Sequence, residues 1–192
     1  MCAGPLRGEL RVPVEPERLG ALIGAKGEVK RRIEEALNVR IRVDSANSEV
    51  RISPREGATV VNVLRARDVV RAISYGFSPE RALRLLDESQ ALDVIDLKEV
   101  CRSREDMVRI KGRIIGREGK ARAMIEDLTG AYLSVYDRYV AIIGDYEQVR
   151  VAREAVLMLI QGRQHRTVYN FLRSECKRLR QRRYQLWEVG PR

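Results

Sequence analysis

Hydrophobic residues recur along the chain with two different periods, and the switches between them outline its secondary structure. From Leu10 to Val14 apolar and polar residues alternate, which predicts a half-buried strand, and Pro13 places that strand at a sheet edge. After Gly27 the apolar residues fall on one helical face and the charged residues on the other. Continued to residue 76, the pattern predicts the order β-α-α-β-β-α, with elements over 10–14, 16–23, 28–37, 39–43, 50–52 and 58–75.

The same succession of elements occurs a second time. Leu22–Gly27 (LIGAKG) aligns with Ile114–Gly119 (IIGREG) at an offset of 92 residues, and Ile33–Glu35 aligns with Ile125–Asp127 at the same offset. The offset shrinks to 90 in the strand pair and to 86 in the last helix, so the first copy carries the longer loops. The second copy predicts a strand over 94–97, helices over 104–115 and 120–128, strands over 132–135 and 140–143, and a helix over 146–161.

Two such copies predict two similar domains rather than a solenoid, whose repeats are only about 20 to 50 residues long. The fold class we expect is α+β, with each domain a three-stranded antiparallel sheet packed on helices. We expect a first domain over 1–76, a helical connector over 77–91, a second domain over 92–162, and a basic C-terminal helix and tail over 163–192. Ser78-Pro79 supplies the start of the connector helix.

The charge of the chain indicates an acidic partner. Its 192 residues carry 37 Lys and Arg against 27 Asp and Glu, a net charge of +10 and a pI near 9.9. The segment after Gly162 is strongly basic, and contact of that segment with an RNA backbone would make binding salt-dependent. A solvated basic tail is the alternative interpretation of the same residues.

Several classes of protein do not fit the composition. No apolar stretch approaches the roughly 20 residues that span a bilayer, and the N-terminus shows no secretory signal, so we expect a cytoplasmic protein without a membrane partner. Three scattered cysteines and the single His165 support neither a disulfide framework nor a metal site, and no cofactor is indicated. Aromatic residues make up 5%, too few for an exposed base-stacking platform.

The chemistry of the repeat lies in its paired glycines. Two glycines that flank a two-residue turn between helices let the chain bend sharply and expose backbone N–H groups. Those donors, the next helix N-terminus and nearby cations suit a phosphate group. A single Gly-x-x-Gly is weak evidence, but here the motif lies between two helices, precedes a strand pair and a helix, and occurs twice.

In this context IGAKG at 23–27 and IGREG at 115–119 resemble the loops of two type I KH domains, and the resemblance covers nearly the whole chain. The KH module clamps about four nucleotides of a single strand. More narrowly, IKGRIIGREGK at 110–120, LTG at 128–130, VAIIG at 140–144 and RQHRTVY at 163–169 are similar to the archaeal KH protein family related to the eukaryotic pre-ribosomal factor Dim-two, or partner of Nob-one.

This resemblance implies a non-catalytic RNA-binding factor of small ribosomal subunit assembly. It implies contact with the 3′ end of 16S-type rRNA near its maturation site. The implied partners are the rRNA-processing endonuclease that cuts there and the alpha subunit of initiation factor two.

Candidate site residues are taken from the two loops and the basic faces beside them. Arg40 and Arg42 project from the strand face opposite to Ile41, where they are either RNA contacts or solvated surface. Val29, Ile33, Ile41 and Val43 form either the floor of the groove or the core beneath it. The predicted RNA-binding residues are Ile23, Gly24, Ala25, Lys26, Gly27, Lys30, Arg31, Arg40 and Arg42 in the first domain and Lys111, Arg113, Ile115, Gly116, Arg117, Glu118, Gly119, Lys120 and Arg122 in the second.

Three alternatives compete with RNA binding by both domains. An RNA-processing enzyme would need acidic pairs such as Glu105-Asp106 or Glu126-Asp127 to hold Mg²⁺, but Glu126-Asp127 repeats Glu34-Glu35 and fits a solvated helix face better. A KH-fold protein-interaction scaffold in which one domain no longer binds RNA is the second alternative, because Glu118 opposes phosphate in the second loop. Single-stranded DNA is the third, as an alternative ligand of the same groove.

Overall fold

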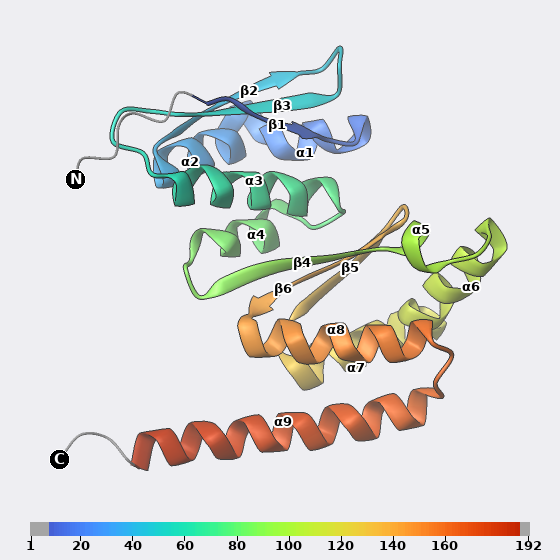
Figure 1. Ribbon diagram of the computed structural model, residues 1–192. Coiled ribbons are helices and arrows are strands. Elements are labelled where there is room, and N and C mark those ends of the chain that lie inside the picture. The colour runs from blue at the N-terminus through green and yellow to red at the C-terminus, as the bar shows by residue number, and fades with distance from the viewer. Residues whose placement is uncertain (1–7, 189–192) are drawn as a thin grey trace. The chain divides into compact units, whose positions relative to one another are not determined.

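The structure is a computed structural model that describes residues 8–188 of the chain. Its contacts divide the chain after Leu92 into two units, and each unit holds one three-stranded sheet (Figure 1). Both units follow the order β-α-α-β-β-α, so the predicted α+β class and the predicted succession of elements are confirmed.

In the first unit the sheet has helices on one side only (Figure 1). Its strand order is β1-β3-β2, which leaves β1 at one edge, as Pro13 predicts, and β2 at the other. The two short helices that follow residue 78 pack against the preceding long helix, α3, and belong to this unit. The elements are β1 (Leu10–Pro13), η1 (Pro16–Arg18), α1 (Leu19–Ile23), η2 (Ala25–Gly27), α2 (Glu28–Leu37), β2 (Val39–Asp44), β3 (Glu49–Pro54), α3 (Val60–Ser74), α4 (Pro79–Ala82) and η3 (Leu83–Leu86).

The second unit repeats this arrangement with strand order β4-β6-β5. The short helix α5 was not predicted; the Asp96 side chain caps it by accepting the backbone N–H of Lys98 at 2.9 Å. The elements are β4 (Gln90–Asp96), α5 (Leu97–Val100), α6 (Arg104–Ile115), η4 (Arg117–Gly119), α7 (Lys120–Thr129), β5 (Tyr132–Tyr136), β6 (Tyr139–Asp145), α8 (Tyr146–Ile160) and α9 (His165–Glu188).

Repeated positions of the sequence occupy repeated positions of the core. Each member of four aligned pairs is at most 1% exposed, and burying one such side chain contributes about 1.5–3 kcal/mol. The hydrophobic period therefore places helices and strands on their sheets in the same way in both units. These pairs are Leu22 and Ile114, Ile33 and Ile125, Ile41 and Leu133, and Ile52 and Ile142.

Turn lengths account for the shrinking offset between the copies. The turn between β2 and β3 covers residues 45–48, whereas Asp137 and Arg138 alone join β5 to β6. Residues 55–59 separate β3 from α3, whereas β6 runs directly into α8 at Asp145. Asp145 makes this abrupt junction by a capping box, in which its side chain accepts the N–H of Gln148 and the Gln148 side chain accepts the N–H of Asp145.

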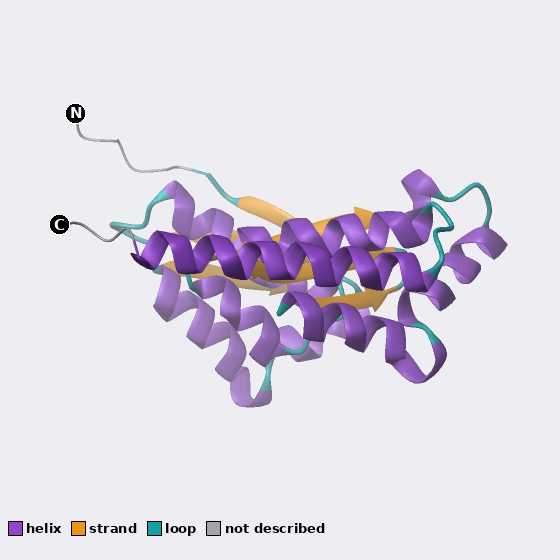
Figure 2. Cartoon of the chain, turned by 90° about the horizontal axis from the view of Figure 1, so that it is seen from below, coloured by secondary structure: helices purple, strands orange, loops and turns teal. Residues whose placement is uncertain are grey.

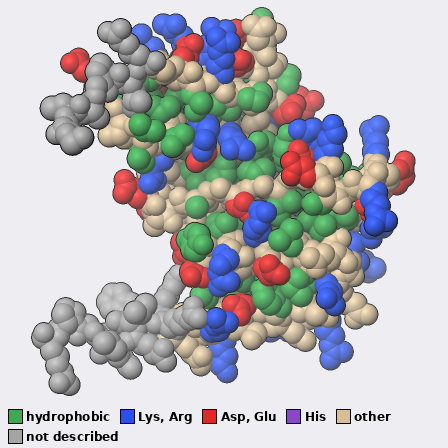
Figure 3. Space-filling view, in the orientation of Figure 1, with side chains coloured by type: hydrophobic (Ala, Val, Ile, Leu, Met, Phe, Trp, Pro, Cys, Tyr) green, Lys and Arg blue, Asp and Glu red, His purple; other side chains and the backbone are tan. Residues whose placement is uncertain are grey.

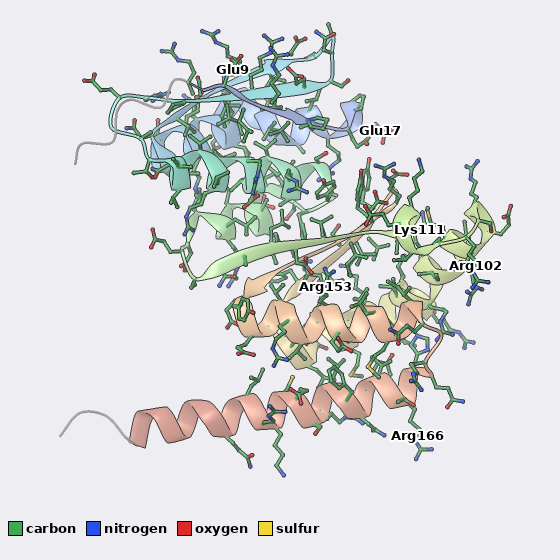
Figure 4. The ribbon with its side chains drawn as sticks, viewed as in Figure 1. Glu9, Glu17, Arg102, Lys111, Arg153 and Arg166 are labelled. Atoms are coloured by element: carbon green, nitrogen blue, oxygen red, sulfur yellow. The ribbon has the colours of Figure 1, made fainter. Side chains whose placement is uncertain are left out.

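The C-terminal helix α9 belongs to the second unit, where it packs against α7 and α8, and it is the long helix nearest the viewer in Figure 2. Val168 and Leu172 on α9 are fully buried in the core of this unit. On the sheet side, Arg153 of α8 reaches Asp93 of β4 at 2.6 Å (Figure 4). The predicted final helix is therefore an integral part of the second unit over its first turns.

Candidate nucleic-acid interface

The loop between α1 and α2 has a backbone that glycine permits. Gly24 has φ +71° and Gly27 has φ +78°, and Lys26 between them is also left-handed at φ +51°. A Cβ on Gly24 would lie 2.5 Å from Cγ2 of Val29, so a side chain there must push α2 away. Gly27 has open space around it, and its φ alone favours glycine.

The loop between α6 and α7 reproduces this geometry almost degree for degree. Gly116 has φ +72° and Gly119 has φ +75°, with the left-handed Glu118 at φ +54° between them. A Cβ on Gly116 would meet the Cβ of Ala121 at 2.6 Å. Both loops therefore hold the same conformation, and the two helices approach each other at the first glycine in each.

Backbone donors at the loop tips are free for a ligand. In the first loop the N–H of Gly24 donates to Gly20 O at 2.9 Å and the N–H of Gly27 donates to Gly24 O at 3.2 Å. Among the described residues, the N–H groups of Ala25 and Lys26 make no such bond. These donors precede the ten-residue helix α2, whose first N–H, that of Glu28, donates to Ala25 O. The second loop is built in the same way, and this arrangement suits an anion.

Charge near the two loops is equal in amount but differs in placement. Lys26, Lys30 and Arg31 accompany one acid, Glu28, which gives +3 − 1 = +2 for residues 24–31. For residues 116–123 the sum is again +3 − 1 = +2, from the cations Arg117, Lys120 and Arg122 and the acid Glu118.

The acid of the second loop is tied to a neighbouring cation. Glu118 lies 3.3 Å from the ammonium of Lys120, and both side chains are about three-quarters exposed. Such an exposed pair contributes roughly 0–1 kcal/mol, so a phosphate can displace it at little cost. Glu118 therefore reduces the field at the loop tip without closing the site.

Each helix that follows a loop is bonded to the edge strand beside it. The Glu34 carboxylate on α2 accepts the backbone N–H of Ile41 on β2 at 2.7 Å, and the Glu126 carboxylate on α7 accepts that of Leu133 on β5 at 2.7 Å. Glu34 is 8% exposed, so its interpretation as part of a solvated face was wrong. The repeat of this acid at an offset of 92 was the signal that could have revealed its role.

The edge strand also offers polar backbone groups to a ligand. In an antiparallel ladder the N–H and C=O of one residue point to the same side. Since the N–H of Ile41 turns to the free edge of β2, the groups of Val39 and Val43 turn there as well, and of these two residues the half-buried Val43 is accessible whereas Val39 is fully buried. The strip between the loop, α2 and this edge thus combines phosphate donors with groups that can pair with base edges.

The predicted hydrophobic floor divides into core and partly accessible residues. Ile33 and Ile41 are fully buried and belong to the core, whereas Val29 and Val43 are half-buried. Ile115, at the end of α6 beside the second loop, is 36% exposed and can contact a base, while the equivalent Ile23 is half-buried.

Two residues predicted to bind RNA in the second unit, Lys111 and Arg113, instead form hydrogen bonds within the fold. The Arg113 guanidinium donates to the carbonyl oxygens of Leu159 at 3.3 Å and Arg163 at 2.6 Å, which bridges the end of α8 and the approach to α9. Lys111, labelled in Figure 4, donates its ammonium proton to Asp137 O at 2.9 Å in the β5–β6 turn. The period of α6 did not reveal these roles, because both residues lie on a polar face.

Arg40 and Arg42 lie away from the loops. Both are exposed and alternate with the buried Ile41, so they stand on the sheet face opposite to the helices. The structure thus brings together the loop residues 23–27 with Lys30 and Arg31, and residues 115–120 with Arg122, but places Arg40 and Arg42 on another surface.

The acidic pairs considered for Mg²⁺ have structural partners. Hydrogen bonds from the Arg109 side chain and the Arg102 backbone lower the pKa of Asp106, and bonds from its own backbone N–H and from Ser103 lower the pKa of Glu105. Within residues 8–188 no group of three or more His, Cys, Asp or Glu side chains is arranged to hold a metal. Over the same described range, no helix has both the length and the apolarity needed to cross a membrane.

Comparison with known proteins agrees with the loop geometry. A family model described as a eukaryotic type KH domain (KH domain type I) matches residues 91–177, and a KH domain model matches residues 9–72. A KH domain-containing protein of Methanocaldococcus jannaschii is 42% identical over 93% of this chain and 78% of its own length. The pre-rRNA-processing protein PNO1 of Coccidioides immitis is 28% identical over 90% of this chain and 69% of its own length.

A solved structure narrows the family further. A chain in the crystal structure of the a/eIF2alpha–aDim2p–rRNA complex of Pyrococcus horikoshii superimposes with a TM-score of 0.82 and 40% identity, over 88% of this chain and 94% of that one. The chain belongs to the PNO1/Dim2 family of KH-domain proteins. The resemblance found in the glycine loops and in the segments around them is confirmed, and the two loops are the Gly-x-x-Gly loops of tandem KH domains.

Proposed function

We propose that this PNO1/Dim2 protein is a non-catalytic single-stranded RNA-binding factor of small ribosomal subunit assembly. It holds the 3′ end of 16S-type rRNA in its KH grooves and assists maturation of that end. The supporting observation is the pair of Gly-x-x-Gly loops, which share one backbone conformation, expose N–H donors at their tips and carry a net charge of +2 each.

The site residues of this proposal are those that the structure gathers at the loops. The backbone donors of residues 25–26 and 117–118, between the paired glycines, bind phosphates, and the flanking cations attract the RNA chain. The free edge of β2 and its counterpart β5 read bases. Two grooves of about four nucleotides each give a footprint of at least about eight nucleotides when they act in line.

The relatives supply the biological setting. One relative is a pre-rRNA-processing protein, and the Pyrococcus complex combines aDim2p with rRNA and a/eIF2alpha. We infer that this chain likewise engages rRNA and the alpha subunit of initiation factor two. The rRNA-processing endonuclease is a further proposed partner, resting on the sequence resemblance.

The test is binding of a single-stranded RNA that matches the 3′ end of 16S rRNA, compared with a scrambled RNA and the DNA equivalent. The variants are Ala25→Asp with Lys26→Asp in the first loop and Arg117→Asp with Glu118→Asp in the second. Asp tolerates the left-handed positions 26 and 118, so the loops keep their shape while repelling phosphate. Glu28→Asp is the matched control, since it changes a nearby side chain and keeps the charge.

Selective binding of the matching RNA, lost in one or both loop variants, is the expected result. It also identifies which domain carries the affinity, because each variant disables one loop. Equal and weak binding of all three strands by every variant overturns the proposal and favours a scaffold whose partner is a protein.

A further inference from the structure

A row of arginines crosses the outer face of the first sheet. In the register of the strands, Arg11 on β1 stands opposite Arg51 on β3, and Arg51 stands opposite Arg42 on β2. Arg40 on β2 faces the same side next to Ser53. Neighbouring strands lie about 4.8 Å apart, so the row extends over about 10 Å.

The helices of the first unit leave this face uncovered. The sheet carries α1, α2 and α3 on its other side (Figure 1), and Lys and Arg side chains stand along the upper margin of the unit in the space-filling view (Figure 3). Nitrogen-tipped side chains rise from the strands on this side (Figure 4). Arg11, Arg40 and Arg42 are exposed and Arg51 is half-buried.

The acids on this face lie toward the strand ends and leave the middle basic. Asp44 and Glu49 form the next row toward the β2–β3 turn, where Asp44 accepts from Arg51 at 3.4 Å and Glu49 accepts from it at 3.1 Å. Glu9 lies just before β1, two residues from Arg11, so strand alternation places it on the same face of the sheet as Arg11. Counting all of them, the face carries +4 − 3 = +1, with the positive charge concentrated in the central row.

Two of these cations have no internal partner. Arg40 and Arg42 make no hydrogen bond or ion pair with any described residue, and Arg11 reaches Glu49 only at 3.9 Å. Like charges directly opposite each other in a sheet are destabilising. Within the row, Arg51 alone has close acidic partners in the sheet, and Arg40 and Arg42 are left for an external one.

The corresponding face of the second sheet differs in burial as well as in charge. On β5 and β6 the opposed pairs there are Ser134 with Ala141 and Tyr132 with Ile143, none of them charged. Ser134, Ala141 and Ile143 are buried, whereas Arg11, Arg40 and Arg42 are exposed. Of the two sheet faces, the exposed one is therefore the one that carries the arginine row.

We propose that the outer face of the first sheet is a second RNA-binding surface, which takes the phosphate backbone of nucleotides beyond the four held in the first KH groove. The proposal rests on the proposed function of the protein as an RNA-binding factor. β2 is the strand that links the two surfaces, because its free edge borders the groove and its outer face carries Arg40 and Arg42. An RNA chain that leaves the groove over this edge meets Arg42, then Arg51, then Arg11.

The chemistry of the face favours a nucleic-acid backbone over a protein partner. Guanidinium groups bind phosphate oxygens bidentately, and the exposed central row offers no apolar side chain. Protein interfaces instead have an apolar centre within a polar rim. A row without base-reading residues binds RNA regardless of its sequence at these positions.

The experiment uses the full chain and two RNAs, an octamer that matches the rRNA 3′ end and the same octamer extended to 16 nucleotides. Arg11→Gln with Arg42→Gln removes two cations of the row and leaves Arg51 with its acids. The matched control, Arg102→Gln with Arg104→Gln, removes two exposed cations near the start of α6. Affinity is measured over a range of salt concentrations.

We expect the row variant to bind the extended RNA about tenfold more weakly and to lower the slope of log K against log salt by about 1.4, since each lost single-strand phosphate contact accounts for about 0.7. Its affinity for the octamer and that of the control for both RNAs stay unchanged. Its melting temperature stays the same or rises, because like-charge repulsion is relieved.

An equal loss with both RNAs, an equal loss in the control, or no loss with the extended RNA overturns the inference. Failure of the inference differs from failure of the proposed function. If the loop variants abolish octamer binding while the row variant has no effect, only the second surface is wrong. If the loop variants also leave octamer binding intact, the proposed function fails.

Discussion

The carboxylate of Glu34 accepts the backbone N–H of Ile41 at 2.7 Å and so joins α2 to the edge strand β2. Glu126 and Leu133 repeat the bond at the same distance in the second KH domain. Because an edge strand has backbone groups without strand partners, a helix carboxylate that binds one of them fixes the width of the strip between helix and strand. This strip is the proposed site of the bases.

Glu34→Ala is therefore expected to destabilise the first domain. The change leaves a buried N–H without an acceptor, and loss of a hydrogen bond to a charged group costs about 1.5–3 kcal/mol. Glu35→Ala is the matched control, since Glu35 is exposed and its loss should stay within about 0.5 kcal/mol. Urea unfolding of both variants measures the difference, and equal stabilities would contradict a structural role for Glu34.

Hydrophobic period and repetition were enough to predict most of the fold. The helix predicted after Gly27, with apolar residues as far as Leu37, coincides with α2, and the helix predicted over 104–115 matches α6, because a capping or glycine residue marks each boundary. The strand predicted over 94–97 is shifted, since β4 begins at Gln90 and Leu97 already belongs to α5. A short helix such as α5 has too few residues to show a period.

The candidate site could be predicted only in part. The paired glycines predicted the loops, because few residues other than glycine fit a positive φ where two helices approach closely. The alternation in β2 correctly placed Arg40 and Arg42 on the strand face opposite to Ile41. The partner of a polar side chain depends on the three-dimensional fold. Arg113 and Glu34 therefore resembled surface residues in the sequence, although both bond to backbone groups in their units.

Gly24→Ala should damage the first loop more than Gly27→Ala does. The left-handed helical conformation of Gly27 costs an alanine about 1–2 kcal/mol, and the backbone of Gly24, with φ +71° and ψ 178°, lies in a region that is essentially restricted to glycine and costs about 1–3 kcal/mol. Only at Gly24 would the new Cβ also clash with Val29, at 2.5 Å, so we expect a total of about 2–4 kcal/mol there. Thermal unfolding of the two variants tests the ranking, and RNA affinity should fall in the same order.

Gly112→Ala is the counterpart that separates loop glycines from helix glycines. Gly112 lies inside α6 and has no positive φ, and a methyl group added there would meet no atom within 4 Å. Alanine exceeds glycine in helix propensity by about 0.8–1.0 kcal/mol, so this variant should be more stable than the parent protein. A destabilised Gly112→Ala would show that the face of α6 around it is occupied.

Stability should depend on pH through the start of α6. A hydrogen bond from Arg109 and one from the Arg102 backbone lower the pKa of Asp106 in the folded protein. Its stabilising contribution is then fully present above the unfolded pKa of about 3.9 and is lost as pH falls through the lower folded value. Asp106→Asn should melt below the parent protein at pH 7, and the gap should close in strong acid. A melting-temperature difference that does not change with pH would contradict this prediction. Asp127→Asn is the control, because Asp127 is exposed.

Arg113→Ala should lower the stability of the protein, whereas Arg117→Ala should lower its RNA affinity. The Arg113 guanidinium donates to the carbonyls of Leu159 and Arg163, so its removal loosens α6 from the α8–α9 junction. Charged hydrogen bonds of this kind are worth about 1.5–3 kcal/mol, so Arg113→Ala should lower the unfolding free energy by about 2 kcal/mol while leaving RNA affinity nearly intact. Arg117 is exposed at the tip of the second loop, and Arg117→Ala should weaken RNA binding without changing stability. Chemical unfolding and RNA titration of both variants decide the matter, and an affinity loss in Arg113→Ala equal to that in Arg117→Ala would return Arg113 to the RNA-binding surface.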